Sequence, residues 1–197
     1  MCWSWQVSLA TFSVCSLSVY QWFQSGFISG KDALFWLSFI SMQFVETLLW
    51  WSINWHIPWL NTLGSALGAG IILSQPLASI NRIPDSENWT RFYLLSIIVF
   101  IILGGFKDLE LRSRVSKRGH LLWLWLTQNP IAIATWVFFL LAPLLVNKYA
   151  ISFTAGFATF VISLYFYARD GTWASIWCWL AAIFVLWGWI CKFYINQ

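Results

Sequence analysis

Residues 38–55, SFISMQFVETLLWWSINW, decide the fold class, because they form an apolar run long enough to cross a membrane with one acidic residue, Glu46, inside it. An ionised carboxylate in hydrocarbon costs roughly 2.5 kcal/mol or more. Glu46 must therefore be neutral, be paired, or face the interior of a helical bundle instead of lipid. We expect it to face the interior.

The composition predicts an integral membrane protein. Of the 197 residues, 60% are hydrophobic and 9% are charged, and the mean hydropathy is +0.70. Soluble domains carry roughly a quarter charged residues, so this chain has too few charges to cover a surface in water. We predict an all-α, polytopic integral membrane bundle of about seven transmembrane helices in one domain, residues 1–197. The apolar segments are 5–24, 33–53, 59–81, 90–106, 121–146, 149–167 and 173–194.

The loop 107–118 sets the expected orientation. It combines five basic residues with only Asp108 and Glu110. Basic loops remain on the cytoplasmic side, which places the N-terminus inside and the C-terminus outside. The expected partners are the lipid bilayer and, at this loop, anionic lipid headgroups. The loop is too short for a nucleic-acid surface. A homo-oligomer or a larger membrane complex remains open, and neither the cofactor nor the kind of membrane is indicated.

Two apolar segments have internal features that affect packing. Segment 121–146 is longer than one crossing needs and contains Pro130 and Pro143, so its helix should kink near Asn129 or begin there after a short interfacial piece. Totals of six or eight crossings therefore remain open. In segment 59–81, Gly64 and Gly68 are four residues apart, as are Ala66 and Gly70, and small residues at this spacing allow a neighbouring helix to approach closely.

Polar residues are expected to gather around Glu46. Gln43 and Trp50 share its helical face, at i−3 and i+4. At about 1.5 Å rise per residue, Glu46 lies about 21 Å from Asp32. The same arithmetic, applied to the segment that follows His120, places two amides close to that level. The candidate polar cluster thus contains Glu46, Gln43, Asn129, Gln128 and, nearer the interface, His120.

Three states of Glu46 can be distinguished. Without a cationic partner it stays protonated and donates a hydrogen bond to an amide such as Asn129. Beside Lys107 or His120 it is ionised and structural. If water reaches it, it can load and release protons or bind a cation. We therefore weigh a structural hydrogen bond between helices against a role in permeation and against a catalytic acid.

The preferred functional prediction is a small transporter or channel that passes protons, small ions or a small solute through the polar cluster. One alternative is a non-catalytic subunit or assembly protein whose tryptophan-rich faces dock other membrane proteins or pigments. Another is an intramembrane enzyme that uses Glu46 as an acid on a lipid or isoprenoid. Catalysis is less favoured, because the spacing suggests no metal site, no paired carboxylates and no Ser-His-Asp arrangement. Asp170, in the turn YARDGTW, is expected to be a cap or turn residue.

The segment SMQFVETLLW resembles a Met-Gln-x-x-Glu-x-x-x-Trp pattern found in uncharacterised small polytopic proteins of large DNA viruses and unicellular algae. Three further short segments resemble segments of the same proteins: Gln75-Pro76, GHLLW at 119–123 and ASIWCW at 174–179. The resemblance implies a seven-helix membrane protein and carries over no activity. It adds Gln75 to the candidate polar residues. The expected aromatic lining around the cluster is Trp50, Trp123 and Trp177, and Cys178 also matches the patterns.

Overall fold

The computed structural model describes residues 4–84, 86–105, 107, 109–127, 130–146 and 150–195. The all-α class is confirmed, since about 80% of the structure is helical. Within the described residues, seven helices have 17 residues or more. They are α1 (Trp5–Gln24), α2 (Gly30–Asn54), α3 (Pro58–Ile80), α4 (Ser86–Ile102), α6 (Pro130–Val146), α7 (Ala150–Tyr167) and α8 (Trp173–Ile195). The shorter elements are β1 (Ser113–Val115), β2 (Leu121–Trp123), α5 (Leu124–Thr127) and the 3-10 helix η1 (Ala168–Asp170).

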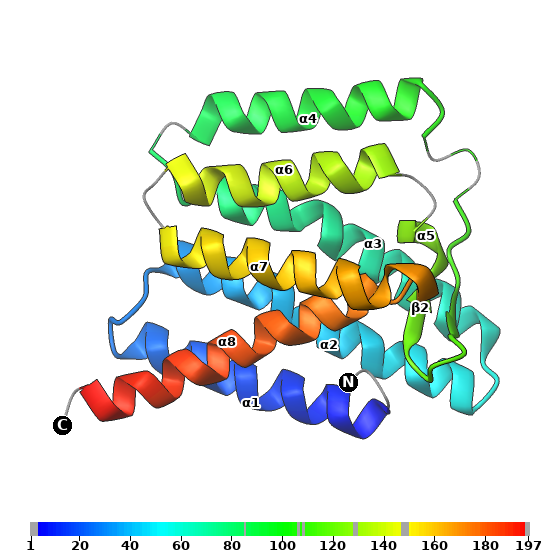
Figure 1. Ribbon diagram of the computed structural model, residues 1–197, viewed down its shortest axis with the longest axis horizontal. Helices are drawn as coiled ribbons and strands as arrows, with labels where there is room; N and C mark the ends of the chain where they lie inside the picture. Colours follow the sequence, from blue (N-terminus) through cyan, green and yellow to red (C-terminus); the bar gives the residue numbers. More distant parts are fainter. Residues whose placement is uncertain are drawn as a thin grey trace.

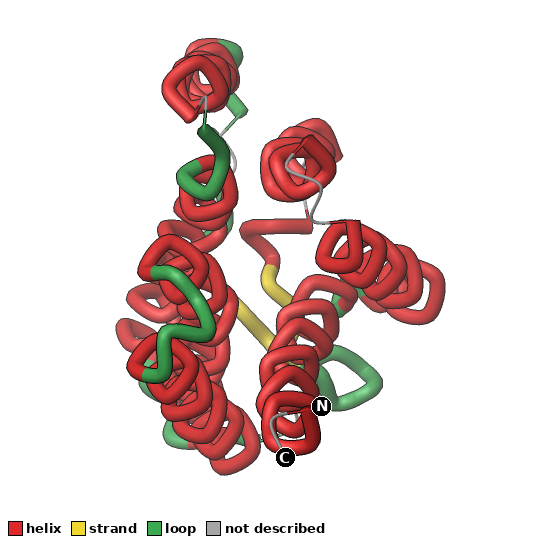
Figure 2. The backbone as a smooth tube through the Cα atoms, turned by 90° about the vertical axis from the view of Figure 1, so that its left-hand side faces the viewer, coloured by secondary structure: helices red, strands yellow, loops and turns green. Residues whose placement is uncertain are grey.

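The long helices form two layers. Figure 1 shows them running back and forth along one direction, so that α1 begins and α8 ends at opposite ends of the bundle. Seen end-on in Figure 2, α1 to α4 lie side by side in chain order, and α6 to α8 form the facing layer. Contacts of α8 with α1 and α2, and of α6 with α3, join the layers. We call the space where they meet the seam.

Two helices, α2 and α3, are long and apolar enough to cross a membrane. Helix α6 and residues Trp173–Trp187 of α8 are apolar but shorter. The buried core helix of a soluble protein has the same length and composition. Helices α2 and α3 are therefore candidate membrane helices by length and composition, and seven crossings remain a prediction.

Helix α2 begins earlier than the predicted residue 33 because it has a capping box. The Ser29 hydroxyl accepts a hydrogen bond from the Asp32 backbone N–H (3.2 Å), and the Asp32 carboxylate accepts one from the Ser29 N–H (3.3 Å). Arg82, just beyond α3, pairs with the same carboxylate at 2.7 Å and lies over the Phe35 ring. The start of α2 is thus fixed to the end of α3.

The predicted single helix over 121–146 is wrong in its first part. Residues 121–123 form strand β2, which pairs antiparallel with β1, and α6 begins at Pro130. Proline favours the first helical position because its fixed φ fits there and its missing N–H would be unpaired anyway. Of the two alternatives predicted for this segment, the helix that begins near residue 129 after a short preceding piece is therefore confirmed. Figure 2 shows the hairpin reaching between the two layers, and all three β2 side chains are buried.

The glycines of α3 divide into a packed face and an open face. A Cβ atom on Gly64 would lie 3.0 Å from a Leu49 methyl, and one on Gly68 would lie 3.2 Å from a Val45 methyl. A Cβ on Gly70 would meet nothing within 4 Å. The predicted close approach therefore occurs on the Gly64 and Gly68 face, where α3 packs against α2.

Candidate functional site

Glu46 lies inside the bundle, with 0% of its surface exposed. Helix α2, which carries it, contacts α1 and α3 in its own layer and α8 in the facing layer. The carboxyl is eight residues from the end of α2, or about 12 Å of helical rise. An ionisable group thus lies at the seam, away from both ends of its helix.

Hydroxyl groups from two other helices donate hydrogen bonds to the Glu46 carboxyl. Ser175 Oγ of α8 donates to Oε1 at 2.8 Å, and Ser8 Oγ of α1 donates to Oε2 at the longer distance of 3.5 Å. Both serines are buried. The carboxyl therefore connects three helices and both layers.

Sequence reasoning missed Ser8 and Ser175. The depth estimate counted residues from the helix ends as if these were level, but α2 has 25 residues and α1 has 20. Near the hairpin, α2 extends past the first turns of α1 and α8 (Figure 1). A serine close to the start of a short helix can therefore reach a residue far along a longer one. The available signal was the presence of hydroxyl residues in these apolar segments, and the segment of α1 alone has four serines and one threonine.

Gln43, one turn before Glu46, is also fully buried. Neither its amide nitrogen nor its amide oxygen has a hydrogen-bond partner among the described residues. Its backbone carbonyl accepts a hydrogen bond from Thr47 Oγ1 at 3.0 Å. A buried amide without a partner costs about 1–3 kcal/mol. Gln43 and Glu46 are thus two buried polar side chains one turn apart on α2, which we call the polar pair, and the Gln43 amide retains unused donor and acceptor capacity.

Gln75 belongs to a different level of the bundle. It is fully buried, and its amide nitrogen donates to the backbone carbonyl of Ser38 at 3.2 Å. Ser38 is eight residues before Glu46, which is about 12 Å along α2. Gln75 thus ties α3 to α2 near the opposite end from the hairpin, apart from the Glu46 pair.

The remaining predicted polar residues are two amides, which the structure does not describe, and His120. Gln128 and Asn129 lie outside the described residues. His120 is buried at the hairpin, where its ring makes an edge contact with Tyr167 at 5.5 Å between centroids. Burial lowers the pKa of His120. One of the three predicted states is an ionised Glu46 beside Lys107. The Lys107 side chain is exposed, so it is not buried beside Glu46.

The predicted aromatic residues are packed core residues. Trp50, Trp123 and Trp177 are 6%, 1% and 2% exposed and belong to one apolar cluster. Trp123 stacks on Trp125 at 5.4 Å, and Trp177 donates its indole N–H to Thr159 Oγ1 at 3.1 Å. These tryptophans therefore belong to the packed core that both layers share.

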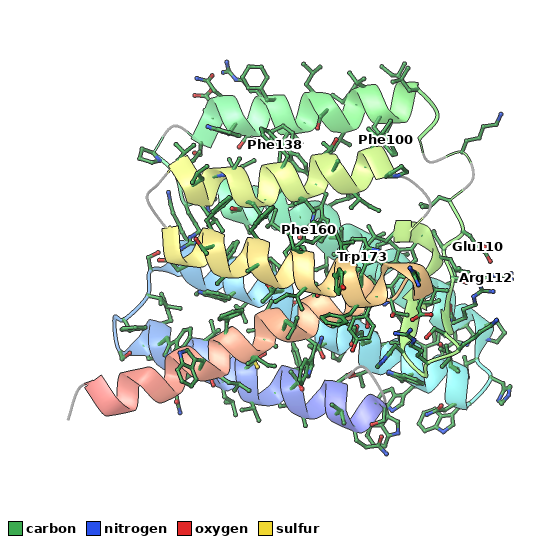
Figure 3. The ribbon with its side chains drawn as sticks, viewed as in Figure 1. Phe100, Glu110, Arg112, Phe138, Phe160 and Trp173 are labelled. Carbon is green, nitrogen blue, oxygen red and sulfur yellow. The ribbon has the colours of Figure 1, made fainter. Side chains whose placement is uncertain are left out.

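An apolar groove of about 500 Å³ lies beside this core, between α6, α7 and α8. Its wall includes Phe138, Phe160 and Trp173, which Figure 3 labels on these three helices. Trp50, Trp123 and Trp177 do not line it. The groove was not predicted, because it depends on how three helices diverge and not on any one of them.

Metal-ligating side chains do not cluster within the described part of the chain. No group of three or more His, Cys, Asp or Glu side chains there could hold a metal ion. Asp170 lies in η1 and pairs with Arg118 at 2.8 Å, as a turn residue would. Comparison with protein families, curated proteins and solved structures finds no match to this chain. The resemblance to small viral and algal membrane proteins therefore stays a prediction.

Proposed function

We propose that the chain is a polytopic membrane protein that passes protons, small ions or a small solute through its bundle, with Glu46 as the loading group. The observation that carries this proposal is that a carboxyl and an amide, one turn apart on α2, are both fully buried inside the bundle. Ionisable groups within membrane helices are costly, and they persist mainly where ions, protons or substrates interact with them.

The hydrogen bonds of Glu46 suit a group that changes its protonation state. Hydroxyls such as Ser8 and Ser175 both donate and accept, so they can satisfy a carboxylate or a protonated carboxyl by rotating. The unused polar atoms of Gln43, one turn away, could contact water or an ion entering the seam. A purely structural core gains nothing from such an amide, because an apolar residue would remove its burial cost.

The outer surface supports a membrane location. Helices α4 and α7 carry large apolar side chains that are exposed along their length, more than the surface of a soluble monomer normally shows. They are Phe92, Leu94, Leu95, Ile98, Val99, Ile101 and Ile102 on α4, and Phe157, Val161, Ile162, Tyr165 and Phe166 on α7. Hydrocarbon would solvate these side chains without cost.

The charges support the proposed orientation. The segments at the hairpin end of the bundle (Figure 1) contain six basic residues, and the described segments near the loops at the other end contain Lys31, Arg82 and Arg91. The six are Lys107, Arg112, Arg114, Lys117, Arg118 and Arg169. The positive-inside tendency would make this the cytoplasmic end. The N-terminus, next to the start of α1, would then be inside and the C-terminus outside.

A second candidate is a non-catalytic membrane subunit or scaffold. The observation that favours it is the direct contact of Ser175 with Glu46, which can fix helix packing without any transported species. In this case the exposed apolar faces would bind other membrane proteins. No observation in the described residues favours the intramembrane enzyme over these two.

Proton flux in liposomes separates the candidates. The full chain is reconstituted with a pH-sensitive dye inside, and flux is measured for the wild type and for Glu46→Gln. Glutamine keeps the shape and hydrogen-bonding capacity of glutamic acid but cannot titrate, so the transporter should lose most of its flux. Glu110→Gln, at an exposed residue before the hairpin, is the matched control and should retain it. Equal flux in Glu46→Gln and the wild type would contradict the proposal. Absent wild-type flux of protons, alkali cations and small solutes would favour the scaffold.

A further inference from the structure

We infer that the groove between α6, α7 and α8 binds one acyl chain of an anionic glycerophospholipid, whose phosphate contacts Arg169 at the cytoplasmic end. This inference rests on the membrane location proposed above and not on transport. It assigns a specific lipid site to a part of the chain that the Glu46 pair does not use.

The walls of the groove fit a hydrocarbon chain. Five lining residues form a single stripe along α6, at i, i+3, i+4, i+7 and i+8. This stripe is about 12 Å long. Phe160 and Leu164 of α7 and Trp173 of α8 form the other walls. The α6 stripe consists of Pro130, Ile133, Ala134, Val137 and Phe138.

The groove opens toward the surrounding membrane. Ala134 is exposed and Phe138 is 54% exposed, whereas Phe160 and Trp173 are 9% and 4% exposed and form the floor. A volume of about 500 Å³ is within the range of small-molecule sites. An apolar groove within hydrocarbon is filled by lipid chains, so its walls alone would not select one lipid.

Selection would come from the charged end. The turn after α7 lies between two lining residues in the chain, Leu164 and Trp173, and it carries the exposed Arg169. Arg118 of the hairpin reaches the same turn, where it donates to the Phe166 carbonyl (3.3 Å) and pairs with Asp170 (2.8 Å). Arg118 thus offsets the negative charge of Asp170, which leaves Arg169 to attract an anion.

The groove and this turn meet at the same end of the bundle. Helix α6 begins there, α7 ends there and α8 begins there, as Figure 1 shows. A phosphate at the membrane surface and a chain descending along α6 therefore match the arrangement of charged and apolar groups. Juxtamembrane arginine attracts anionic headgroups, each by about 1 kcal/mol, which corresponds to about fivefold in occupancy.

Native mass spectrometry of the detergent-purified full chain tests the inference. The protein is incubated with equal amounts of phosphatidylglycerol and phosphatidylcholine that have identical acyl chains. We expect one retained lipid, with phosphatidylglycerol favoured about fivefold. Ala134→Trp should fill the groove and abolish retention. Arg169→Gln, at an exposed turn residue that leaves the core untouched, should abolish only the preference.

Two matched variants control for the added bulk and the lost charge. Ala158→Trp changes an exposed alanine of α7 outside the groove, and Arg114→Gln removes an exposed arginine of the hairpin. Both variants should retain lipid and should keep the preference for phosphatidylglycerol.

Equal retention of the two lipids by the wild type, or an unchanged preference in Arg169→Gln, would overturn the inference. A wild-type dimer that Ala134→Trp disrupts would show that a second copy covers the groove instead, and would also overturn it.

The failure of this inference differs from the failure of the proposed function. A chain that stays in the membrane under alkaline extraction and carries flux, but retains no phosphatidylglycerol, contradicts only the lipid site. A chain released from membranes by alkaline extraction contradicts both proposals.

Discussion

Helices α2 and α4 were both predicted to cross the membrane, yet they occupy opposite environments in the bundle. Twelve residues of α2 are buried, whereas Tyr93 is the only buried residue of α4. Helix α2 contacts helices of both layers, and α4 lies at the edge against α3 and α6 (Figure 2). Apolarity alone does not distinguish them. The difference visible in the sequence is that α2 has Gln43 and Glu46 in its middle, so polarity at mid-helix marks the central helix.

The largest difference should come from truncating a leucine on each helix. Leu49 of α2 is fully buried against Gly64, so Leu49→Ala should reduce the free energy of unfolding by about 2–5 kcal/mol. Leu95 of α4 is 54% exposed, and Leu95→Ala should change it by less than about 0.5 kcal/mol. Denaturant titration in detergent measures both. Similar losses in the two variants would mean that α4 is packed as tightly as α2.

Ion pairs on the two helices provide the second comparison. Arg82 is 6% exposed and pairs with Asp32 at the start of α2, so Arg82→Gln should cost about 1.5–3 kcal/mol. Arg91 and Glu87 of α4 pair at i and i+4 with both side chains more than 70% exposed. Arg91→Gln should therefore cost less than about 0.5 kcal/mol. Denaturant titration again measures both losses. A larger loss of unfolding free energy in Arg91→Gln than in Arg82→Gln would contradict the stronger contribution of the buried pair.

The glycines of α3 test how closely it packs on α2. Gly68→Val adds atoms where a Cβ would lie 3.0 Å from the Trp125 ring of α5 and 3.2 Å from a Val45 methyl of α2, and it should destabilise the fold by about 1–3 kcal/mol. Gly70→Val, on the open face of the same helix, is the control and should be nearly neutral. Thermal unfolding of the two variants measures the difference. A neutral Gly68→Val would show that the two helices are further apart.

The smallest effect is expected from pH, at the hairpin end. Burial lowers the pKa of His120 below its unfolded value of about 6.5, so the folded state binds fewer protons than the unfolded state. Its contribution to stability is therefore complete above that value and is lost as the pH falls below it. His120→Gln should reduce the fall in melting temperature between about pH 7 and pH 5.5. A fall in His120→Gln as large as in the wild type would contradict this role of His120.

The sequence predicted the helical segments better than their contacts. Apolar runs gave most of the long helices, because such runs are imposed on each helix separately. Strand β2 was missed, since Leu121, Leu122 and Trp123 continue an apolar pattern and periodicity cannot separate a short buried strand from a helix. The start of α6 at Pro130 was recoverable, because proline marks a first turn.

The candidate site was predicted in part. Glu46 and Gln43 share a face because they are three residues apart on one helix, which a sequence specifies directly. The donors Ser8 and Ser175 lie 38 and 129 residues from Glu46 in the chain, and their positions depend on how three helices are offset along their axes. Gln75 was grouped with Glu46 although about 12 Å of helix separates their levels. The positions of helices relative to one another along their axes depend on packing and loop lengths. No local sequence pattern specifies them.

The most direct measurement of the central claim is infrared spectroscopy of the reconstituted protein during a pH jump. We predict that the C=O band of a protonated carboxyl changes with pH in the wild type, and that this change disappears in Glu46→Gln while remaining in Glu110→Gln. That result would show that protons reach the buried carboxyl from water. A carboxyl band that stays constant across the jump, or that changes equally in Glu46→Gln, would contradict the role of Glu46 as a loading group.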